Sequence, residues 1–210
     1  MTERKNHPLA ICKTNQSDWL LKLQNATGRP VVTRLPPKTG TIIFLLDCST
    51  SMLLNNNLHF AKKGGIEYAI EANKKGYNIG LISFGSSAIK NLDPQDNVES
   101  FINNIIKLEV DGSTNLTDAI HMAREILLPS LMEKIIFIVT DGFPDNPDSA
   151  KNEARLAAKS GIEIMTLGTD DADLNFLNLI ATKKEFSNKV NRQFLQQGIK
   201  DMSKLLPGKY

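Results

Sequence analysis

The 210-residue sequence has few cysteines, few aromatic residues and no long apolar run. Its two cysteines, Cys12 and Cys48, are too few for a disulfide framework or a four-cysteine zinc site. A run of about 18 apolar residues, which a membrane-spanning helix needs, is absent. The first residues also lack the apolar core of a signal peptide. We therefore expect no membrane span and a reducing, cytoplasmic setting.

Positive charge is scarce in the middle of the chain. Residues 41–182 carry 11 Lys and Arg against 19 Asp and Glu, a net charge of −8, whereas residues 1–40 and 183–210 each carry seven against two. Aromatic residues make up 6% of the sequence. A nucleic-acid groove would combine a basic folded body with interleaved aromatic residues. Nucleic acid is therefore not an expected partner.

The chain divides by composition into an extension and one domain. Four prolines punctuate residues 1–40, and we expect this segment to be a basic N-terminal extension. Within it, residues 17–25 fit a short helix or a strand, and residues 31–33 fit a short strand. The remainder, residues 41–210, is long enough for one substantial core. The hydrophobic content of the whole chain, 41%, is ordinary for a globular protein.

Apolar strands alternate with amphipathic helices after residue 40. Continuous apolar runs predict strands buried on both faces, and residues 87–92 predict an antiparallel edge strand. The predicted strands are 41–46, 78–84, 87–92, 134–140 and 162–168, and the predicted helices are 58–76, 94–108, 116–128, 148–160, 173–181 and 192–206. This alternation predicts an α/β fold with a doubly wound, mostly parallel sheet, one antiparallel edge strand and helices on both faces, as in a Rossmann-like fold.

Acidic and hydroxyl side chains gather where the predicted strands end. Asp47, Ser49 and Ser51 follow the first strand at alternate positions, and Asp141 follows the fourth. Thr114 lies in the loop before the helix at 116–128. Ligands in open α/β sheets bind outside the carboxyl ends of the strands. Oxygen donors without His or Cys suit a hard divalent cation, namely Mg²⁺, Mn²⁺ or Ca²⁺.

These residues and their order resemble the von Willebrand factor type A domain. The family's metal-ion-dependent adhesion site has the pattern Asp-x-Ser-x-Ser followed by a Thr and an Asp. The resemblance assigns that metal site to Asp47, Ser49, Ser51, Thr114 and Asp141. It covers about residues 41–206, and Ser113 stands where the family often has glycine. It does not account for residues 1–40.

The resemblance implies a non-enzymatic interaction module. Two carboxylates and three hydroxyls leave the cation electrophilic and with an open coordination position, which a Glu or Asp of a partner protein can fill. We expect Asn55, Asn115, Phe143 and Pro144 to form a rim that selects the partner. The resemblance suggests a bacterial intracellular signalling or stress-response setting, beside a protein kinase and phosphatase or an AAA+ ATPase.

Other interpretations of the same residues stay open. A metal-dependent phosphohydrolase would use Asp47 as nucleophile, but the second Asp that it needs two residues later is Ser49 here. No nucleophile elbow surrounds either serine, and His59 and His121 are expected at the surface or in packing. We expect Asp171 or Asp173 to cap a helix and Cys48 to be a small core residue. A third interpretation is a structural domain that binds no metal.

Overall fold

The computed structural model describes residues 39–169 and 172–208. The chain separates into two compact units, Met1–Pro37 and Lys38–Tyr210. The predictions for residues 17–25, 31–33 and Cys12, and that for Asp171, lie outside the described residues. The boundary at residue 40 therefore stays a prediction.

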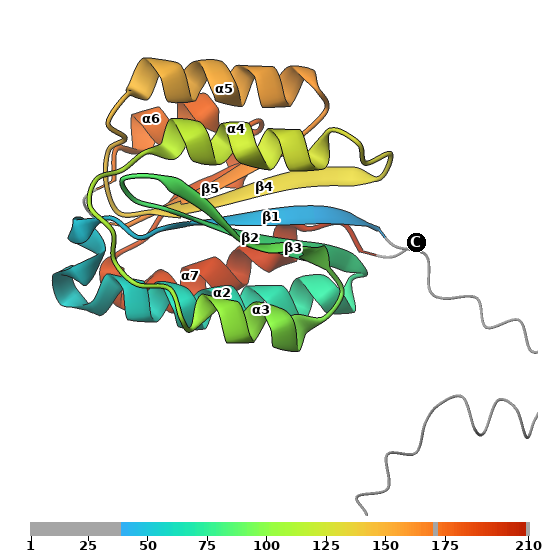
Figure 1. Cartoon of the computed structure of the whole chain (residues 1–210), viewed down its shortest axis with the longest axis horizontal. Coiled ribbons are helices and arrows are strands. Elements are labelled where there is room, and N and C mark those ends of the chain that lie inside the picture. The colour runs from blue at the N-terminus through green and yellow to red at the C-terminus, as the bar shows by residue number, and fades with distance from the viewer. Residues whose placement is uncertain (1–38, 170–171, 209–210) are drawn as a thin grey trace, which may run out of the picture. The chain divides into compact units, whose positions relative to one another are not determined.

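A six-stranded sheet forms the centre of the second unit (Figure 1). Its order is β3-β2-β1-β4-β5-β6, in which only the β2–β3 pair is antiparallel. Residues in β1 are buried along its whole length, because strands lie on both sides and helices on both faces. The strands are β1 (Gly40–Asp47), β2 (Tyr77–Phe84), β3 (Ala88–Gln95), β4 (Glu133–Thr140), β5 (Glu163–Gly168) and β6 (Ser187–Lys189).

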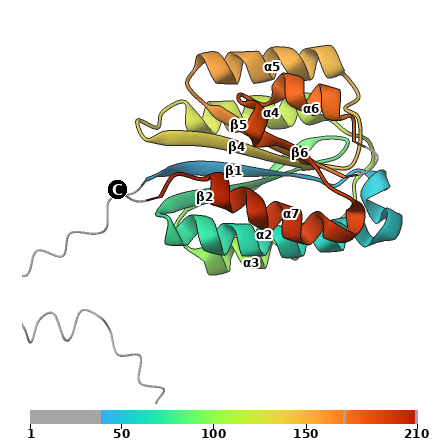
Figure 2. The same cartoon turned by 180° about the vertical axis from the view of Figure 1, so that it is seen from behind.

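Helices cover both faces of this sheet. Figures 1 and 2 show α2, α3 and α7 on one face and α4, α5 and α6 on the other. The α-helices are α2 (Asn57–Lys74), α3 (Val98–Ile105), α4 (Leu116–Leu127), α5 (Pro147–Lys159), α6 (Leu174–Ile180) and α7 (Leu195–Met202). Short 3₁₀ helices are η1 (Thr50–Asn56), η2 (Lys184–Phe186), η3 (Arg192–Phe194) and η4 (Ser203–Leu205). This is the predicted doubly wound α/β fold.

The sheet separates two hydrophobic cores. Phe44 and Phe137 project from adjacent strands toward α2, where Tyr68 contacts both rings. On the opposite face, alternate residues of the same strands, such as Ile43 and Ile136, pack with the helices α4, α5 and α6. Burial on both faces explains why these strands are unbroken apolar runs.

The structure contains elements that the sequence analysis did not predict, namely β6 and 3₁₀ helices such as η1, and some bounds differ. β3 continues to Gln95 and α3 begins only at Val98, because the Asn97 side chain caps that helix by accepting from Ser100 N. The sequence pattern gives no sign of β6, a polar three-residue strand that pairs with β5. Within the residues described, no helix has both the length and the apolar character needed to cross a bilayer.

Candidate metal centre

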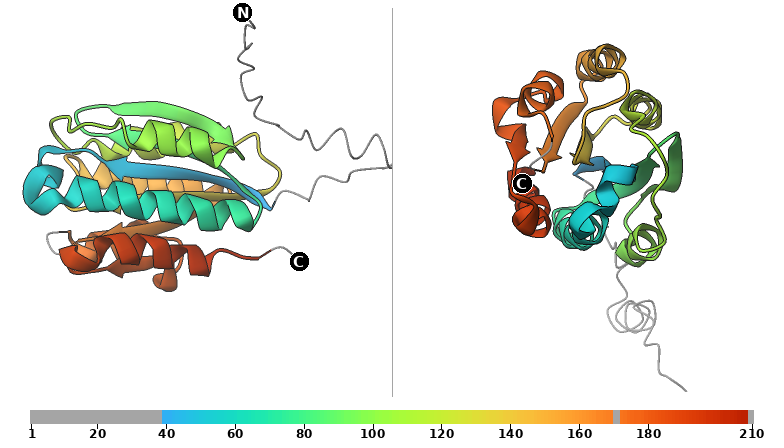
Figure 3. Two further views of the ribbon diagram at one scale, coloured as in Figure 1. Left: turned by 90° about the horizontal axis from the view of Figure 1, so that it is seen from below. Right: turned by 90° about the vertical axis from the view of Figure 1, so that its left-hand side faces the viewer.

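The candidate site lies at the edge of the sheet where the parallel strands end. β1 ends at Asp47 and β4 ends at Thr140, so the two loops that follow start side by side. The right-hand view in Figure 3 looks at this edge, with η1 and the surrounding loops facing the reader. Asp47, the last residue of β1, and Asp141, the first residue after β4, therefore lie at the ends of neighbouring strands, as the sequence predicts.

The loop 111–115, which contains Thr114, is held against the loop after β1 by backbone hydrogen bonds. Asp111 N donates to Cys48 O at 2.7 Å, and Thr50 N donates to Gly112 O at 2.9 Å. Asn115 N donates to Gly85 O at 2.8 Å, which ties the other end of the loop to the end of β2. Gly112 has a φ of +59°, a conformation that glycine adopts without strain. Three separated segments therefore meet through their backbones.

Hydrogen bonds connect four of the five predicted ligands, namely Asp47, Ser49, Ser51 and Asp141. Ser51 Oγ donates to Asp141 Oδ1 at 2.6 Å and lies 2.9 Å from Ser49 Oγ. The second oxygen of Asp141 accepts from Asn57 Nδ2 at 3.0 Å. Asp47 Oδ1 accepts from the backbone N–H of Ser49 at 2.8 Å. The hydroxyls and the Asp141 carboxylate form one connected group.

Asp47 is a buried carboxylate that is costly to ionise. Burial raises the pKa of Asp47 to about 6, even though hydrogen bonds from Ser49 and from Thr140 Oγ1 act to lower it. The charge on Asp141 raises that pKa slightly further. The cause is the loss of water around the charged form. The site therefore strongly favours a positive charge beside Asp47.

Thr114 occupies the loop 111–115 with its backbone fixed on both sides. Its N–H donates to both carboxylate oxygens of Asp145 at 3.2 Å, and its carbonyl oxygen accepts from Asp145 N at 3.1 Å and from Leu116 N at 2.9 Å. Thr114 is nearly buried. Its side chain forms no hydrogen bond to the other four ligands in the described structure. Thr114 is therefore assigned to the site only because its backbone is held beside them.

No basic side chain neutralises the two aspartates. Neither Asp47 nor Asp141 forms an ion pair with a residue in 39–169 or 172–208, although both are buried. Nor does that part of the chain contain a cluster of three or more His, Cys, Asp or Glu side chains suited to a metal. Buried charges are normally paired or bound to a metal. Two carboxylates and neighbouring hydroxyls fit one hard divalent cation better than a soft metal.

The expected rim is only partly at the surface. Asn55 and Phe143 are exposed, and the Phe143 ring contacts the Phe176 ring with centroids 5.4 Å apart. Asn115 is half-buried and caps α4, accepting from Asp118 N. Pro144 is buried, so it offers no surface to a partner and does not belong in the rim.

The structure adds residues that the sequence analysis missed. Thr140 donates to Asp47, and Asn57 donates to Asp141. Leu53 and Leu54, which are 63% and 61% exposed, stand on η1 directly after Ser51. The sequence gives no signal for this pair, because η1 was not predicted and the exposure of the two leucines follows from its conformation.

Several structural expectations for single residues are confirmed. Cys48 is buried, and the described residues give it no disulfide partner. Asp173 caps α6, its Oδ1 accepting from Asn175 N at 2.8 Å and from Phe176 N at 3.3 Å. His59 and His121 are both exposed.

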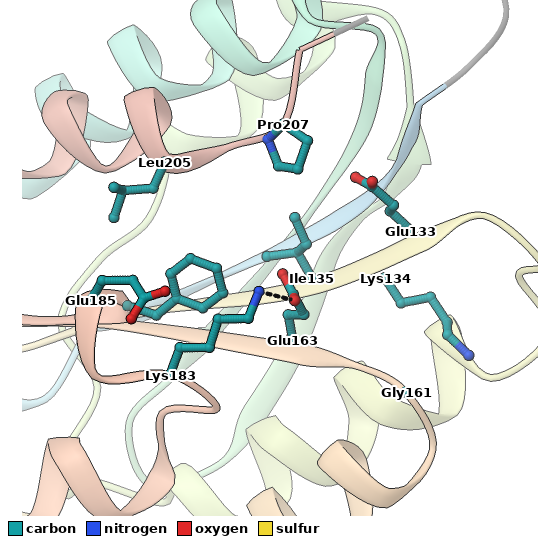
Figure 4. Close-up of a pocket in the computed structure, with 10 residues that line it drawn as sticks. Glu133, Lys134, Ile135, Gly161, Glu163, Lys183, Glu185, Leu205 and Pro207 are labelled. Atoms are coloured by element: carbon teal, nitrogen blue, oxygen red, sulfur yellow. Dashed lines mark hydrogen bonds and ion pairs between the residues drawn. The ribbon is translucent and has the colours of Figure 1, made fainter. Parts of the chain in front are cut away.

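A separate cavity of about 590 Å³ lies at the opposite edge of the sheet, where β4 and β5 begin (Figure 4). Lys183 forms an ion pair with Glu163 at 2.6 Å and lies 4.6 Å from the centre of the Phe186 ring. Tyr77 donates to Glu133 there. Lys183 and Glu163 thus neutralise each other, and the cavity lies at the opposite ends of the strands from Asp47 and Asp141.

Known structures share this fold. The vWF domain of the type V pili tip protein Mfa5 from Porphyromonas gingivalis has a TM-score of 0.72 at 16% identity, covering 80% of this chain and 95% of that one. Proximal thread matrix protein 1 from the mussel byssus, in a structure described with a zinc-occupied MIDAS motif, has a TM-score of 0.71 at 23% identity, covering 80% and 46%.

One curated relative and one family profile match the sequence. UPF0353 protein MAV335 of Mycobacterium avium is 25% identical over an alignment of 154 residues, and the match covers 64% of this chain and 46% of that protein. The chain thus spans about half the length of the curated relative that it matches. The profile of the von Willebrand factor type A domain matches residues 41–201, well over half of the chain. The chain therefore belongs to the von Willebrand factor type A domain family.

Proposed function

We propose that this domain binds a partner protein through a divalent cation held at the candidate metal centre. The proposed ligands are Asp47, Ser49, Ser51, Thr114 and Asp141. The observation that carries the proposal is the pair of buried aspartates with no cationic partner among the described residues. A Mg²⁺ ion, or Mn²⁺ or Ca²⁺, would supply the missing charge, and an open coordination position would accept a Glu or Asp carboxylate of the partner.

The charge around the site makes such binding depend on the cation. Asp111 and Asp145 are exposed on the loops that flank Thr114, so the surface beside the site is itself acidic. Without a cation, this surface would repel a carboxylate. With a cation bound, the partner's carboxylate is attracted to the metal ion alone, so it binds at one position.

The partner contact extends beyond the cation. Leu53 and Leu54 are exposed on η1, which also contains Ser51 and Asn55, and Phe143 is exposed two residues after Asp141. These residues form the proposed rim, together with the exposed part of the half-buried Asn115. A partner segment with apolar side chains next to its acidic residue would bury this rim, which gives the interaction selectivity that a single carboxylate cannot give.

Binding experiments can test the metal and the partner separately. Calorimetry with Mg²⁺, Mn²⁺, Ca²⁺ and Zn²⁺ should show one site, and Zn²⁺ is included because the mussel protein's structure holds it. Asp47→Ala and Thr114→Ala should abolish cation binding, whereas Asp148→Ala, an exposed aspartate on α5, should not change it. Unchanged binding in the first two variants would overturn the proposal.

A pull-down with and without chelator tests the partner. The proposal predicts partners that are retained in Mg²⁺ and released by chelator, and that the Asp47→Ala variant fails to retain. The regulatory setting suggested by the family resemblance, beside a kinase and phosphatase or an AAA+ ATPase, would be identified by the partners recovered. Partners retained equally in chelator would argue against the metal-bridged contact.

The proposed activity is binding without catalysis. A phosphohydrolase would need a proton donor near Asp47, and the nearest side chains there are the hydroxyls of Ser49 and Thr140. We expect no turnover of p-nitrophenyl phosphate in millimolar Mg²⁺. Turnover that is lost in Asp47→Asn would favour the phosphohydrolase alternative instead.

A further inference from the structure

Asn57, the first residue of α2, is a buried polar side chain that the sequence motif does not include. It is 2% exposed. Its Nδ2 donates to Asp141 Oδ2 at 3.0 Å. Its Oδ1 is buried and has no hydrogen-bond partner among the described residues. An unsatisfied buried acceptor is destabilising, so such a group requires an explanation.

The chemistry of its neighbour fixes the orientation of the Asn57 amide. A flipped amide would place its oxygen against a carboxylate oxygen, and neither atom could donate. The nitrogen therefore faces Asp141, and Oδ1 is the unsatisfied atom. The two oxygens of Asp141 are then held from both sides, by Ser51 and by Asn57.

A helix-capping role does not account for this side chain. Asn56 stands at the cap position of α2, and α2 receives no side-chain capping bond in the described structure. The Asn57 amide is bonded to Asp141 on the loop after β4, 84 residues away in the sequence. The contact therefore connects α2 to the metal centre and does not complete the helix end.

We propose that Asn57 is a positioning residue of the metal centre, whose Nδ2 holds the Asp141 carboxylate and whose Oδ1 accepts a hydrogen bond from a water of the bound divalent cation. This inference rests on the proposed function. A bound Mg²⁺ usually keeps several of its waters, whose O–H groups are strong donors. Residues that orient metal ligands or waters typically change metal affinity 10- to 100-fold.

Calorimetry on one pair of variants tests the inference. Asn57→Ala should weaken Mg²⁺ binding about tenfold. Asn73→Ala, a matched change at the other end of α2, where the side chain bonds to Asp96 O, should leave it unchanged. Unfolding in chelator should show that both variants fold. Equal Mg²⁺ affinity in wild type and Asn57→Ala would overturn the inference.

Comparing Mg²⁺ with Ca²⁺ distinguishes a hydrogen bond from Asn57 Oδ1 to a metal-bound water from the hydrogen bond that Asn57 Nδ2 donates to Asp141. Ca²⁺ has larger and more flexible coordination, whereas Mg²⁺ gives up its waters reluctantly. If Asn57 holds a water, Asn57→Ala should weaken Mg²⁺ binding clearly more than Ca²⁺ binding. An equal loss for both ions would mean that Asn57 acts on Asp141 alone and would overturn the water contact.

A crystal structure of the full chain with Mn²⁺ gives a direct readout. The expected result is a water that coordinates the ion and lies about 2.5–3.0 Å from Asn57 Oδ1. A bound ion with no such water would overturn the inference while leaving the proposed function intact. Failure of the proposed function shows up differently, as Mg²⁺ affinity that Asp47→Ala does not change.

Discussion

At Asp47, burial and hydrogen bonding act in opposite directions on the carboxyl group. Burial dominates and raises the pKa of Asp47 from 3.8 to about 6. The folded state therefore binds this proton more tightly than the unfolded state does. Between pH 3.8 and 6 the folded state holds more protons, so the contribution of Asp47 to stability decreases as pH rises. A cation bound at neutral pH would remove this penalty.

Replacing Asp47 with Asn should therefore stabilise the metal-free protein. The neutral amide can still accept from Ser49 N, and it carries no charge to desolvate. In chelator, the stabilisation of Asp47→Asn relative to wild type should be about 1 kcal/mol larger at pH 7.5 than at pH 5. Urea unfolding at the two pH values measures this difference.

The same variant should lose its response to the cation. In millimolar Mg²⁺, wild type should gain stability and Asp47→Asn should not. Asp148→Asn, at an exposed position, should behave as wild type in both solutions. A pH-independent difference between Asp47→Asn and wild type would contradict the assignment of the buried charge.

At the scale of loops and helices, the segment 111–115 depends on one glycine. Gly112 has a positive φ, and its carbonyl oxygen accepts from both Thr50 N and Thr50 Oγ1 at 2.9 Å. A Cβ there would lie 1.8 Å from Ser86 Oγ. The position of Thr114, two residues later, follows from this turn.

Gly112→Ala should therefore weaken cation binding as well as folding. An alanine with positive φ costs about 1–2 kcal/mol. Gly161→Ala is the matched control, because Gly161 also has a positive φ but no neighbour within 4 Å of its Cβ position. Gly112→Ala should lose more stability in chelator, because its Cβ also meets Ser86, and only Gly112→Ala should bind Mg²⁺ more weakly. Calorimetry and urea unfolding provide the two readouts.

The packing of α7 on α2 depends on another glycine. A Cβ on Gly64 would lie 2.8 Å from both Gln196 O and Ile199 Cβ of α7. Gly64→Ala should destabilise the fold by about 1–2 kcal/mol, because the clash exceeds the gain in helix propensity. Gly208→Ala, with nothing within 4 Å, should be neutral. Equal urea midpoints for the two variants would show that α7 moves aside without cost.

The predictability of each element follows from its burial. β1, β4 and β5 are apolar along their length because both faces are covered, so the sequence pattern identifies them. β6 has three polar residues and owes its existence to pairing with β5 alone, which leaves no local pattern. η1 contains two asparagines with positive φ, Asn55 and Asn56, so its shape depends on backbone conformation that periodicity does not report.

At the scale of the whole molecule, the candidate site depends on which strands are neighbours. The order β2-β1-β4 brings Asp47 and Asp141 together although 94 positions separate them in the sequence. The Asp-x-Ser-x-Ser motif and the strand pattern were enough to predict this convergence. Thr140 and Asn57 could not be predicted, because their roles come from side-chain directions and not from a motif.

A divalent cation should stabilise the whole domain. A ligand at 100 times its Kd adds about 2.7 kcal/mol to the free energy of unfolding. For a chain of this size, that corresponds to a rise in Tm of about 5–10 °C. Thermal unfolding in Mg²⁺ and then in excess chelator measures the shift and its reversal. A Tm that Mg²⁺ does not change at any concentration would contradict the proposed centre.

Hydrogen bonds link Ser49 and Ser51, on the loop after β1, to Asp141 on the loop after β4. The two loops are therefore coupled through these side chains. A substitution at Ser51 should thus be felt at Asp141, on a strand end 90 positions away in the sequence.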